Sequence, residues 1–267
     1  MNKLQFPHPA VGQKPVVIEA GVHVAALNYP QGMWLDPHQH REAQLVYAVS
    51  GNMQVTTPKG RWLVPPNRAV WVPGDLSHEI HMLSDVEMRT LYFDPDWLDR
   101  EGHRGRLDQE FVSQVSPLFK HSILALFDGT DDLARAALLV RLIVRELRRA
   151  DDFAFFMPLP EDQRCRRAAE LVLAAPGKSH IITVLAAKVE TSARTLSRLF
   201  TAETQLSFKA WCQRARIAAA VERLSTTPDV AVSQIASDLG YASIPAFSHA
   251  FRRVTGKSPT EFVTRIK

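Results

Sequence analysis

Residues 16–93 contain short runs in which apolar and polar positions often alternate, separated by clusters of turn-forming residues. Alternation with a period of two is typical of strands that bury one face, and turn signals at this spacing are typical of an antiparallel sandwich or barrel. The runs expected to form strands are residues 22–27, 43–49, 53–57, 69–72 and 88–93. The pattern therefore predicts an N-terminal antiparallel β-barrel domain over residues 1–105.

The pattern changes near residue 117, where apolar positions begin to recur with the period of a helix. Ser116 followed by Pro117 has the form of an N-cap and first helical residue, and predicts a helix over residues 117–127. A second helix is predicted over residues 131–150, with an apolar stripe at Leu133, Ala137, Val140, Val144 and Leu147.

This stripe is suited to packing against another helix, either of a second subunit or of the same domain. We expect residues 106–150 to form a helical dimerisation or coupling segment. Residues 151–160 contain Pro158 and Pro160 and are the expected linker to the rest of the chain.

Beyond residue 160 every segment has a helical pattern, and part of the pattern occurs twice. Residues 185–189 and 196–200 match residues 235–239 and 247–251, with one extra residue in the second turn. Each copy predicts a short helix, a tight connection and a second helix that is apolar on one face, which is the helix-turn-helix arrangement. The sequence predicts an all-α domain over residues 161–267 with two such motifs, and hence a two-domain α+β protein.

The second helix of each copy leaves polar residues outside its apolar face. Arginine can bind guanine bidentately, and hydroxyl groups can reach bases or phosphates. The residues expected to contact DNA are Arg194, Thr195, Ser197 and Arg198 in the first copy, and Pro245, Ser248, His249, Arg252 and Arg253 in the second. For any single one of them, a solvated helix face is the competing interpretation.

Charge is distributed unevenly and supports a polyanionic partner. Residues 160–267 carry 16 lysine and arginine residues against 9 acidic residues, whereas residues 1–159 carry 16 against 19. A basic C-terminal part favours double-stranded DNA as its partner.

Composition excludes two other classes of protein. Two cysteines, Cys165 and Cys212, cannot build a disulfide framework and are expected to be free thiols in a reducing compartment. The longest apolar stretch, residues 133–147, is interrupted by three arginines, and residues 1–15 lack an apolar signal core. We therefore expect a cytoplasmic protein with no membrane partner.

The C-terminal hundred residues resemble the DNA-binding domain of the AraC/XylS family of bacterial transcription regulators. The resemblance is carried by the paired motifs, by Phe247-Ser248-His249-Ala250-Phe251 and by the ending Gly256-Lys257-Ser258-Pro259. It implies an operator DNA, a homodimer and, for an activator, RNA polymerase as partners. Pro245 and His249 depart from the family pattern, which favours phosphate contacts over base reading by the second motif.

The N-terminal domain resembles the cupin barrel, a small jelly roll, in two segments. These are His38-Gln39-His40 with Gln44, and Pro73-Gly74-Asp75 with His78. The cupin resemblance implies a divalent transition metal held by His38, His40 and His78, with Gln44 at the position of the usual glutamate. Glu42 is a substitute ligand if the strand is regular, because alternate residues share one face of a strand.

Two interpretations of these residues stay open at this point. They either hold a metal or line a pocket for a small-molecule effector by hydrogen bonding, together with Trp34 and Trp71. The sequence predicts a DNA-binding transcription regulator that responds to an effector in its N-terminal barrel. The alternative is a metal-dependent cupin enzyme, of the dioxygenase or isomerase type, fused to a DNA-binding domain.

Overall fold

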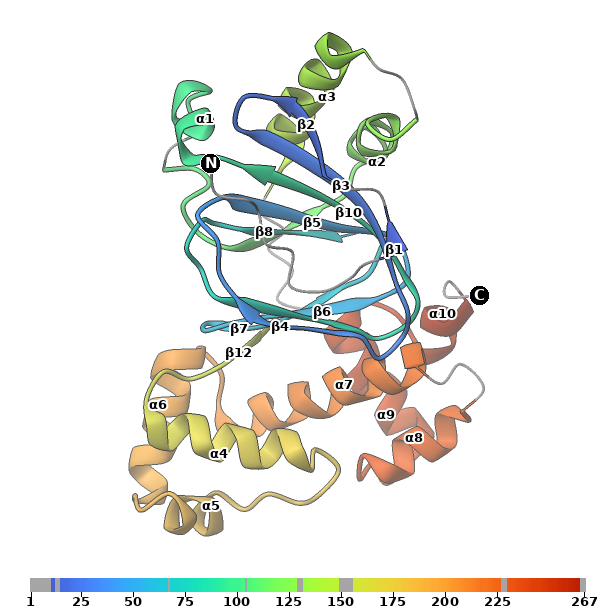
Figure 1. Cartoon of the computed structure of the whole chain (residues 1–267). Helices are drawn as coiled ribbons and strands as arrows, with labels where there is room; N and C mark the ends of the chain where they lie inside the picture. The colour runs from blue at the N-terminus through green and yellow to red at the C-terminus, as the bar shows by residue number, and fades with distance from the viewer. Residues whose placement is uncertain are drawn as a thin grey trace. The chain divides into compact units, whose positions relative to one another are not determined.

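The computed structural model describes residues 11–12, 15–66, 68–103, 105–128, 132–148, 156–226 and 230–264 (Figure 1). The chain divides into two compact units. The first, called the sheet unit below, comprises residues 1–57 and 62–151; the second, the helical unit, comprises residues 58–61 and 152–267. Within the described ranges, no helix has both the length and the apolar composition needed to cross a membrane.

The sheet unit contains two antiparallel sheets. The first has the strand order β1 (Val11–Gly12), β3 (Val22–Tyr29), β10 (Val86–Phe93), β5 (Ala43–Ser50), β8 (Arg68–Val72) and β11 (Phe111–Gln114), with β2 (Val16–Glu19) also pairing with β3. The second contains β7 (Gly60–Val64), β6 (Met53–Thr57), β9 (His78–Met82) and β4 (Trp34–His38) in that order. The described strands therefore form two sheets and not the closed barrel that the sequence predicted.

Each face of the first sheet contributes to a separate core. Val46 and Val70 pack with Ile80 of the second sheet, so one core lies between the sheets. Tyr47 and Trp71, at alternate positions of the same strands, pack on the opposite face.

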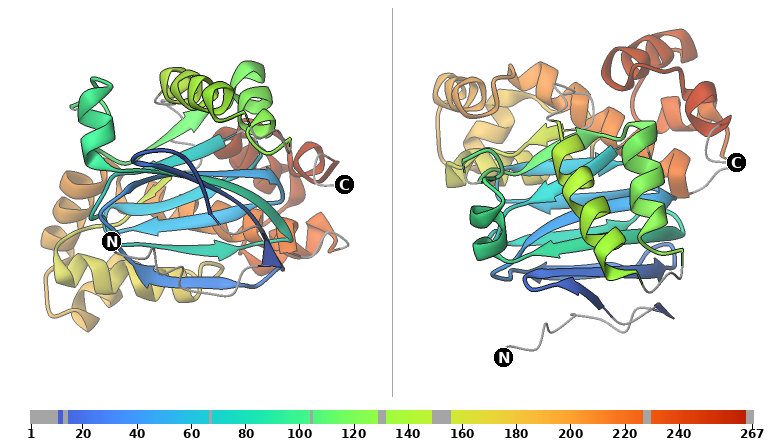
Figure 2. Two further views of the ribbon diagram at one scale, coloured as in Figure 1. Left: turned by 45° about the horizontal axis from the view of Figure 1, so that its top comes forward. Right: turned by 90° about the horizontal axis from the view of Figure 1, so that it is seen from above.

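That opposite face is covered by α1 (Pro95–Arg100), α2 (Pro117–Ala125) and α3 (Leu133–Glu146), and Figure 2 shows α2 and α3 lying across the sheet. Strand β8 is covered on both faces, so all five of its residues are buried. A strand in this position does not show the alternation of polar and apolar residues that is typical of a half-exposed strand.

Several elements differ from the predicted ones. The sequence did not predict β1, β2, β7, β11, β12 or α1, which are only two to six residues long. Strand β11 lies in the segment predicted to be helical and pairs with β8. Helix α2 begins as predicted, with the Ser116 hydroxyl accepting a hydrogen bond from the Phe119 amide at 3.0 Å.

Helix α3 is shorter than the predicted 131–150. The Asp132 carboxylate caps its first turn by accepting from the Arg135 amide, and Leu147 has an extended backbone that ends it. Residues 131, 149 and 150 lie outside the described part of the chain.

The helical unit is built from one short strand and seven helices in its described part. They are β12 (Phe156–Pro158), α4 (Gln163–Ala174), α5 (Ile182–Lys188), α6 (Ala193–Thr204), α7 (Phe208–Thr226), α8 (Val232–Asp238), α9 (Ile244–Thr255) and α10 (Pro259–Thr264). Five residues of the expected linker, 151–155, lie outside the described ranges, and residues 156–158 form β12. Cys165 and Cys212 are free, as predicted, and burial raises their thiol pKa values to about 12 and about 11.

The sequence repeat corresponds to a repeated local geometry. In the turn between α5 and α6, the Thr191 amide donates to the Ala186 carbonyl at 2.9 Å, and between α8 and α9 the Tyr241 amide donates to the Ala236 carbonyl at 2.9 Å. The residue before each donor has a left-handed backbone, with φ of 53° at Glu190 and 75° at Gly240. The two helix pairs therefore turn through the same backbone conformation.

A capping box is present at the start of α10. The Glu261 carboxylate accepts from the Ser258 amide at 2.7 Å, and the Ser258 hydroxyl accepts from the Glu261 amide at 3.2 Å. Replacing Ser258 by alanine removes one of these bonds and is expected to cost about 1 kcal/mol locally. Amide exchange in α10, followed by mass spectrometry, should become about fivefold faster.

Ser237→Ala, at an exposed position of α8, is the matched control and should leave exchange in α10 unchanged. Equal exchange rates in the wild type and Ser258→Ala would contradict a stabilising role for the capping box.

Candidate functional site

Helix α6 presents an exposed basic face. Its core positions Leu196 and Phe200 are fully buried, which leaves Arg194 and Arg198 exposed and one helical turn apart. Neither arginine has an ion-pair partner in the described part of the chain. Ser197 is also exposed on this helix.

Thr195 is less available than the arginines. It is half-buried, and its hydroxyl lies 2.9 Å from that of the N-cap Ser192. The Ser192 hydroxyl also accepts from the Thr195 amide at 3.0 Å, so Ser192 acts as the N-cap of α6.

Helix α9 exposes the residues predicted from the second copy, with one exception. Pro245, His249, Arg252 and Arg253 are exposed, whereas Ser248 is half-buried. Both arginines contact protein groups. Arg252 lies 3.2 Å from a Glu261 carboxylate oxygen, and Arg253 donates to the Gln213 side-chain oxygen at 3.0 Å.

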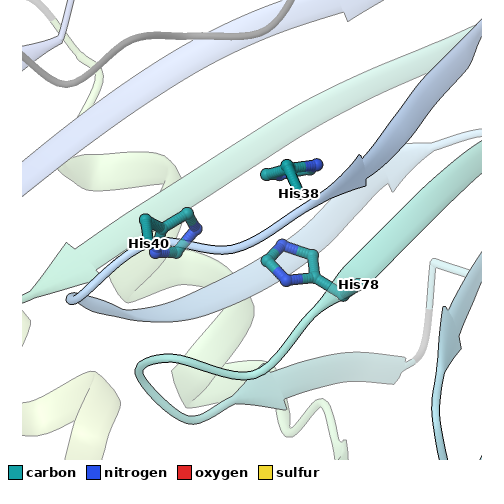
Figure 3. A group of neighbouring side chains, drawn as sticks. All are labelled: His38, His40 and His78. Atoms are coloured by element: carbon teal, nitrogen blue, oxygen red, sulfur yellow. The ribbon is translucent and has the colours of Figure 1, made fainter.

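Three histidines of the sheet unit converge at one end of the sheets (Figure 3). His38 ends β4 and pairs in register with His78, the first residue of β9, while His40 lies in the turn beyond β4. One ring nitrogen of each histidine lies within 4.8 Å of the others. The prediction that His40 shares a strand face with His38 was wrong, because β4 ends at His38, but the turn brings the His40 ring to the same place.

Each of the three rings is oriented by a backbone carbonyl two residues away. The Nδ1 atoms of His38, His40 and His78 lie 2.7, 2.7 and 2.9 Å from the carbonyl oxygens of Asp36, Glu42 and Leu76. A carbonyl oxygen only accepts, so each Nδ1 carries a hydrogen, and a neutral ring then has an unprotonated Nε2. Burial, reinforced by the other two histidines, lowers the pKa of His78 to about 3, so its ring is neutral near pH 7.

Gln44 directs its side-chain oxygen at these Nε2 atoms. Its Oε1 lies 2.9 Å from Nε2 of His78 and 3.3 Å from Nε2 of His40. Its amide nitrogen donates to Thr90 Oγ1 at 2.9 Å and to the Tyr92 hydroxyl at 3.1 Å.

The orientation of the Gln44 amide is fixed by its neighbours. Thr90 donates its own hydrogen to the Leu45 carbonyl at 3.1 Å, so its oxygen accepts from Gln44. The Gln44 oxygen therefore faces Nε2 of His40 and Nε2 of His78, and in the neutral ring of His78 this nitrogen carries no hydrogen. Divalent transition metals are bound in proteins by imidazole nitrogens together with oxygen donors. The histidine nitrogens and the Gln44 oxygen lie close enough together to fit such an ion.

Glu42 does not complete this set. Residues 41 and 42 form a bend before β5 and not part of a regular strand, so the condition for placing the Glu42 side chain beside the histidines is not met. Among the described residues, the group of ligand atoms within 4.8 Å consists of the three histidines and excludes Glu42.

The two tryptophans predicted to line the same pocket lie elsewhere. Trp34 is 45% exposed and stacks on His81, with ring centroids 4.0 Å apart. Trp71 is fully buried in the core under the helices and donates to the Leu107 carbonyl at 2.7 Å. Trp71 lies on the face of the first sheet opposite to Val46 and Val70. Gln44 and Val46 are two residues apart on β5 and therefore share one face, so Trp71 and Gln44 lie on opposite faces of the sheet.

Sequence reasoning missed Thr90 and Tyr92, which hold the Gln44 amide. The available signal was two hydroxyl-bearing residues that continue the alternate positions of Val86 and Met88 along β10. Burial raises the pKa of the Tyr92 hydroxyl, which keeps it protonated.

Comparison with known proteins gave two family matches. A model described as an AraC-like ligand binding domain matches residues 21–147, and one described as a helix-turn-helix domain matches residues 185–265. Together the two matches span most of the chain.

Individual proteins are similar over different lengths. The HTH-type transcriptional regulator NimR of Escherichia coli is 28% identical over 86% of this chain and 82% of its own. The HTH-type transcriptional regulator RipA of Corynebacterium glutamicum is 33% identical over 40% of this chain, a match that spans only 32% of that protein. Among solved structures, fatty-acid-bound ToxT of Vibrio cholerae covers 92% of this chain and 95% of its own at 12% identity, with a TM-score of 0.39.

Proposed function

The chain belongs to the AraC-type family of transcription regulators, and on this basis we propose that its helical unit binds operator DNA with two helix-turn-helix units. The pairs α5–α6 and α8–α9 are the two units, and α6 and α9 are their recognition helices. The observation that carries this proposal is that Arg194 and Arg198 are exposed on α6 and have no ion-pair partner among the described residues.

The helix between the two units has a suitable length for a joint site. Helix α7 has 19 residues and is therefore about 28 Å long. Successive major grooves on one side of DNA are about 34 Å apart, so a spacer of this length is compatible with two recognition helices entering adjacent grooves.

Selection from a random pool of double-stranded DNA tests this proposal with the full-length protein. We expect a site with two short conserved segments about one helical turn apart, bound with an affinity that falls steeply with salt. Recovery of no preferred sequence at any salt concentration would contradict sequence-specific DNA binding.

For the sheet unit we propose a ligand site at His38, His40, His78 and Gln44, with a divalent transition metal as the ligand or as part of it. The support is the meeting of Nε2 of His40 and His78 with the Gln44 oxygen, and the carbonyl groups that orient each ring. A hydrogen bond from the other ring nitrogen to a carbonyl group fixes the tautomer that a histidine ligand requires. A bound ion would supply a positive centre for anionic or chelating molecules.

The competing function is a metal-dependent enzyme of the dioxygenase or isomerase type that uses the same histidines. We favour sensing, because a DNA-binding unit requires an input domain to regulate it. Turnover of an oxidisable small molecule by the iron- or manganese-loaded protein, lost in His78→Ala, would establish the enzyme instead.

We also propose that the regulator is a homodimer through its helices α2 and α3, with RNA polymerase as a further partner if it activates transcription. Leu118, Leu133 and Leu138 are 50, 52 and 69% exposed on these helices. Helices α2 and α3 pack against one another, and exposed apolar side chains on such a pair are the support for an interaction surface here.

Replacing Leu138 by glutamate is therefore expected to convert the dimer to a monomer, because the new charge would have to be buried in the interface. Sedimentation equilibrium at micromolar concentration measures this directly. Leu171→Glu, at a 39% exposed position of α4, is the control and should remain dimeric. A dimer of unchanged strength in Leu138→Glu would place the interface elsewhere.

A further inference from the structure

The first turn of α9 is both apolar and exposed. Ile244 is 47% exposed, and Pro245 and Ala246 are also exposed. The core of this part of the unit is formed by Phe247, Ala250 and Phe251, so Ile244 is not needed to complete it.

The equivalent turn of α6 has a different chemistry. There the first three helical residues are Ala193, Arg194 and Thr195, which include a guanidinium and a hydroxyl group. In α9 the N-cap is Ser243, whose hydroxyl oxygen accepts from the Ala246 amide at 3.3 Å and keeps its own hydrogen to donate. The side chains of the first three helical residues, Ile244, Pro245 and Ala246, present no hydrogen-bonding group to a partner.

The N-terminal residues of a recognition helix contact base edges in the major groove. The 5-methyl group of thymine is the methyl group exposed on those edges, and it is read by apolar contact and not by hydrogen bonding. We propose that Ile244, Pro245 and Ala246 recognise thymine 5-methyl groups, so that the second unit reads sequence by methyl contact. This inference rests on the proposed function of the helical unit.

The charges on α9 fit this arrangement. Arg252 and Arg253 lie two turns beyond the tip and are anchored to Glu261 and Gln213, which holds them away from the apolar residues. They are placed to contact phosphate, while the apolar tip contacts bases. The second unit then combines phosphate contacts with base reading, whereas the sequence alone favoured phosphate contacts.

Replacing thymine by deoxyuridine tests the proposal, because this change removes only the methyl group. In the operator obtained by selection, each thymine of the segment bound by the second unit is replaced in turn and binding of the full-length protein is titrated. Burial of one methyl group predicts a loss of about fourfold in affinity at each contacted thymine.

The contact is assigned to Ile244 by repeating the titration with variants. Ile244→Ser should bind the thymine site more weakly and respond less than twofold to deoxyuridine, whereas Ile244→Val should keep most of the response. Val184→Ser, at a 52% exposed position of α5 in the first unit, is the matched control and should respond as the wild type does. Circular dichroism confirms that each variant is folded.

Each remaining outcome has a defined meaning. A selected site without thymine in the second segment, or wild-type binding that is indifferent to deoxyuridine at every position there, overturns the inference and leaves DNA binding intact. A response of equal size in the wild type and Ile244→Ser also overturns it, because other residues would then read the methyl groups. Failure to select any DNA overturns the proposed function itself.

Discussion

Replacing Arg194 or Arg198 by alanine is expected to weaken binding to the selected operator by about 5- to 150-fold, equivalent to about 1–3 kcal/mol for each residue. Both side chains are exposed on α6, four residues apart, with no ion pair in the described chain to compete for them. A bidentate contact to guanine is lost completely in alanine. Gel-shift or fluorescence-anisotropy titration at fixed salt measures the loss.

Two further variants separate base reading from charge. Arg198→Lys keeps the positive charge but not the planar fork, so it should keep the salt dependence of binding and lose discrimination between bases. Lys188→Ala removes an exposed charge from α5 and should lower the affinity for all DNA sequences by the same factor. Unchanged operator affinity in both alanine variants of α6 would refute its assignment as a recognition helix.

Replacing His78 by alanine is expected to weaken binding of Zn²⁺ or Co²⁺ to the full-length protein by at least about 100-fold, since even outer-shell partners of metal ligands contribute 10- to 100-fold. His78 is the most buried of the three histidines and faces both His38 and His40. Calorimetric titration and the visible spectrum of bound Co²⁺ report the affinity and the coordination.

Gln44→Glu is the most informative partner variant. A carboxylate in place of the amide oxygen adds a negative charge to the donor set, so metal affinity should rise while the metal-free protein loses stability by burying that charge. Zn²⁺ should then raise the unfolding temperature more in Gln44→Glu than in the wild type.

His81→Ala is the matched control, because His81 lies on the same strand but stacks on the exposed Trp34. It should bind metal as the wild type does. If neither the wild type nor Gln44→Glu binds a first-row divalent metal, the histidines instead belong to a pocket for an organic effector.

The helical unit followed from the sequence because its signals are local. The Ser258 cap acts on a backbone amide three residues away, and the period of apolar positions decides which face of α6 or α9 is buried. The turn that is repeated between α5 and α6 and between α8 and α9 requires only one residue with a left-handed backbone, directly before the residue whose amide closes the turn. These features depend on residues that are near one another along the chain.

The ligand site depended on tertiary structure to a much greater extent. The three histidines were recognisable in the sequence, but Gln44, Thr90 and Tyr92 meet only because β5 pairs with β10, 46 and 48 residues apart along the chain. The register between β5 and β8 likewise set the face of the first sheet that Trp71 occupies, and so placed Trp71 under the helices.

The sequence by itself therefore determined the helix pairs, their caps and their exposed arginines, together with the three histidines. Only the tertiary structure decided that the N-terminal strands form two sheets, that His40 reaches the site from the loop after β4, and that the Gln44 oxygen faces Nε2 of His40 and His78. The physical reason is that helix signals act over one or two turns, whereas a site between strands depends on pairing register and on which face each strand buries.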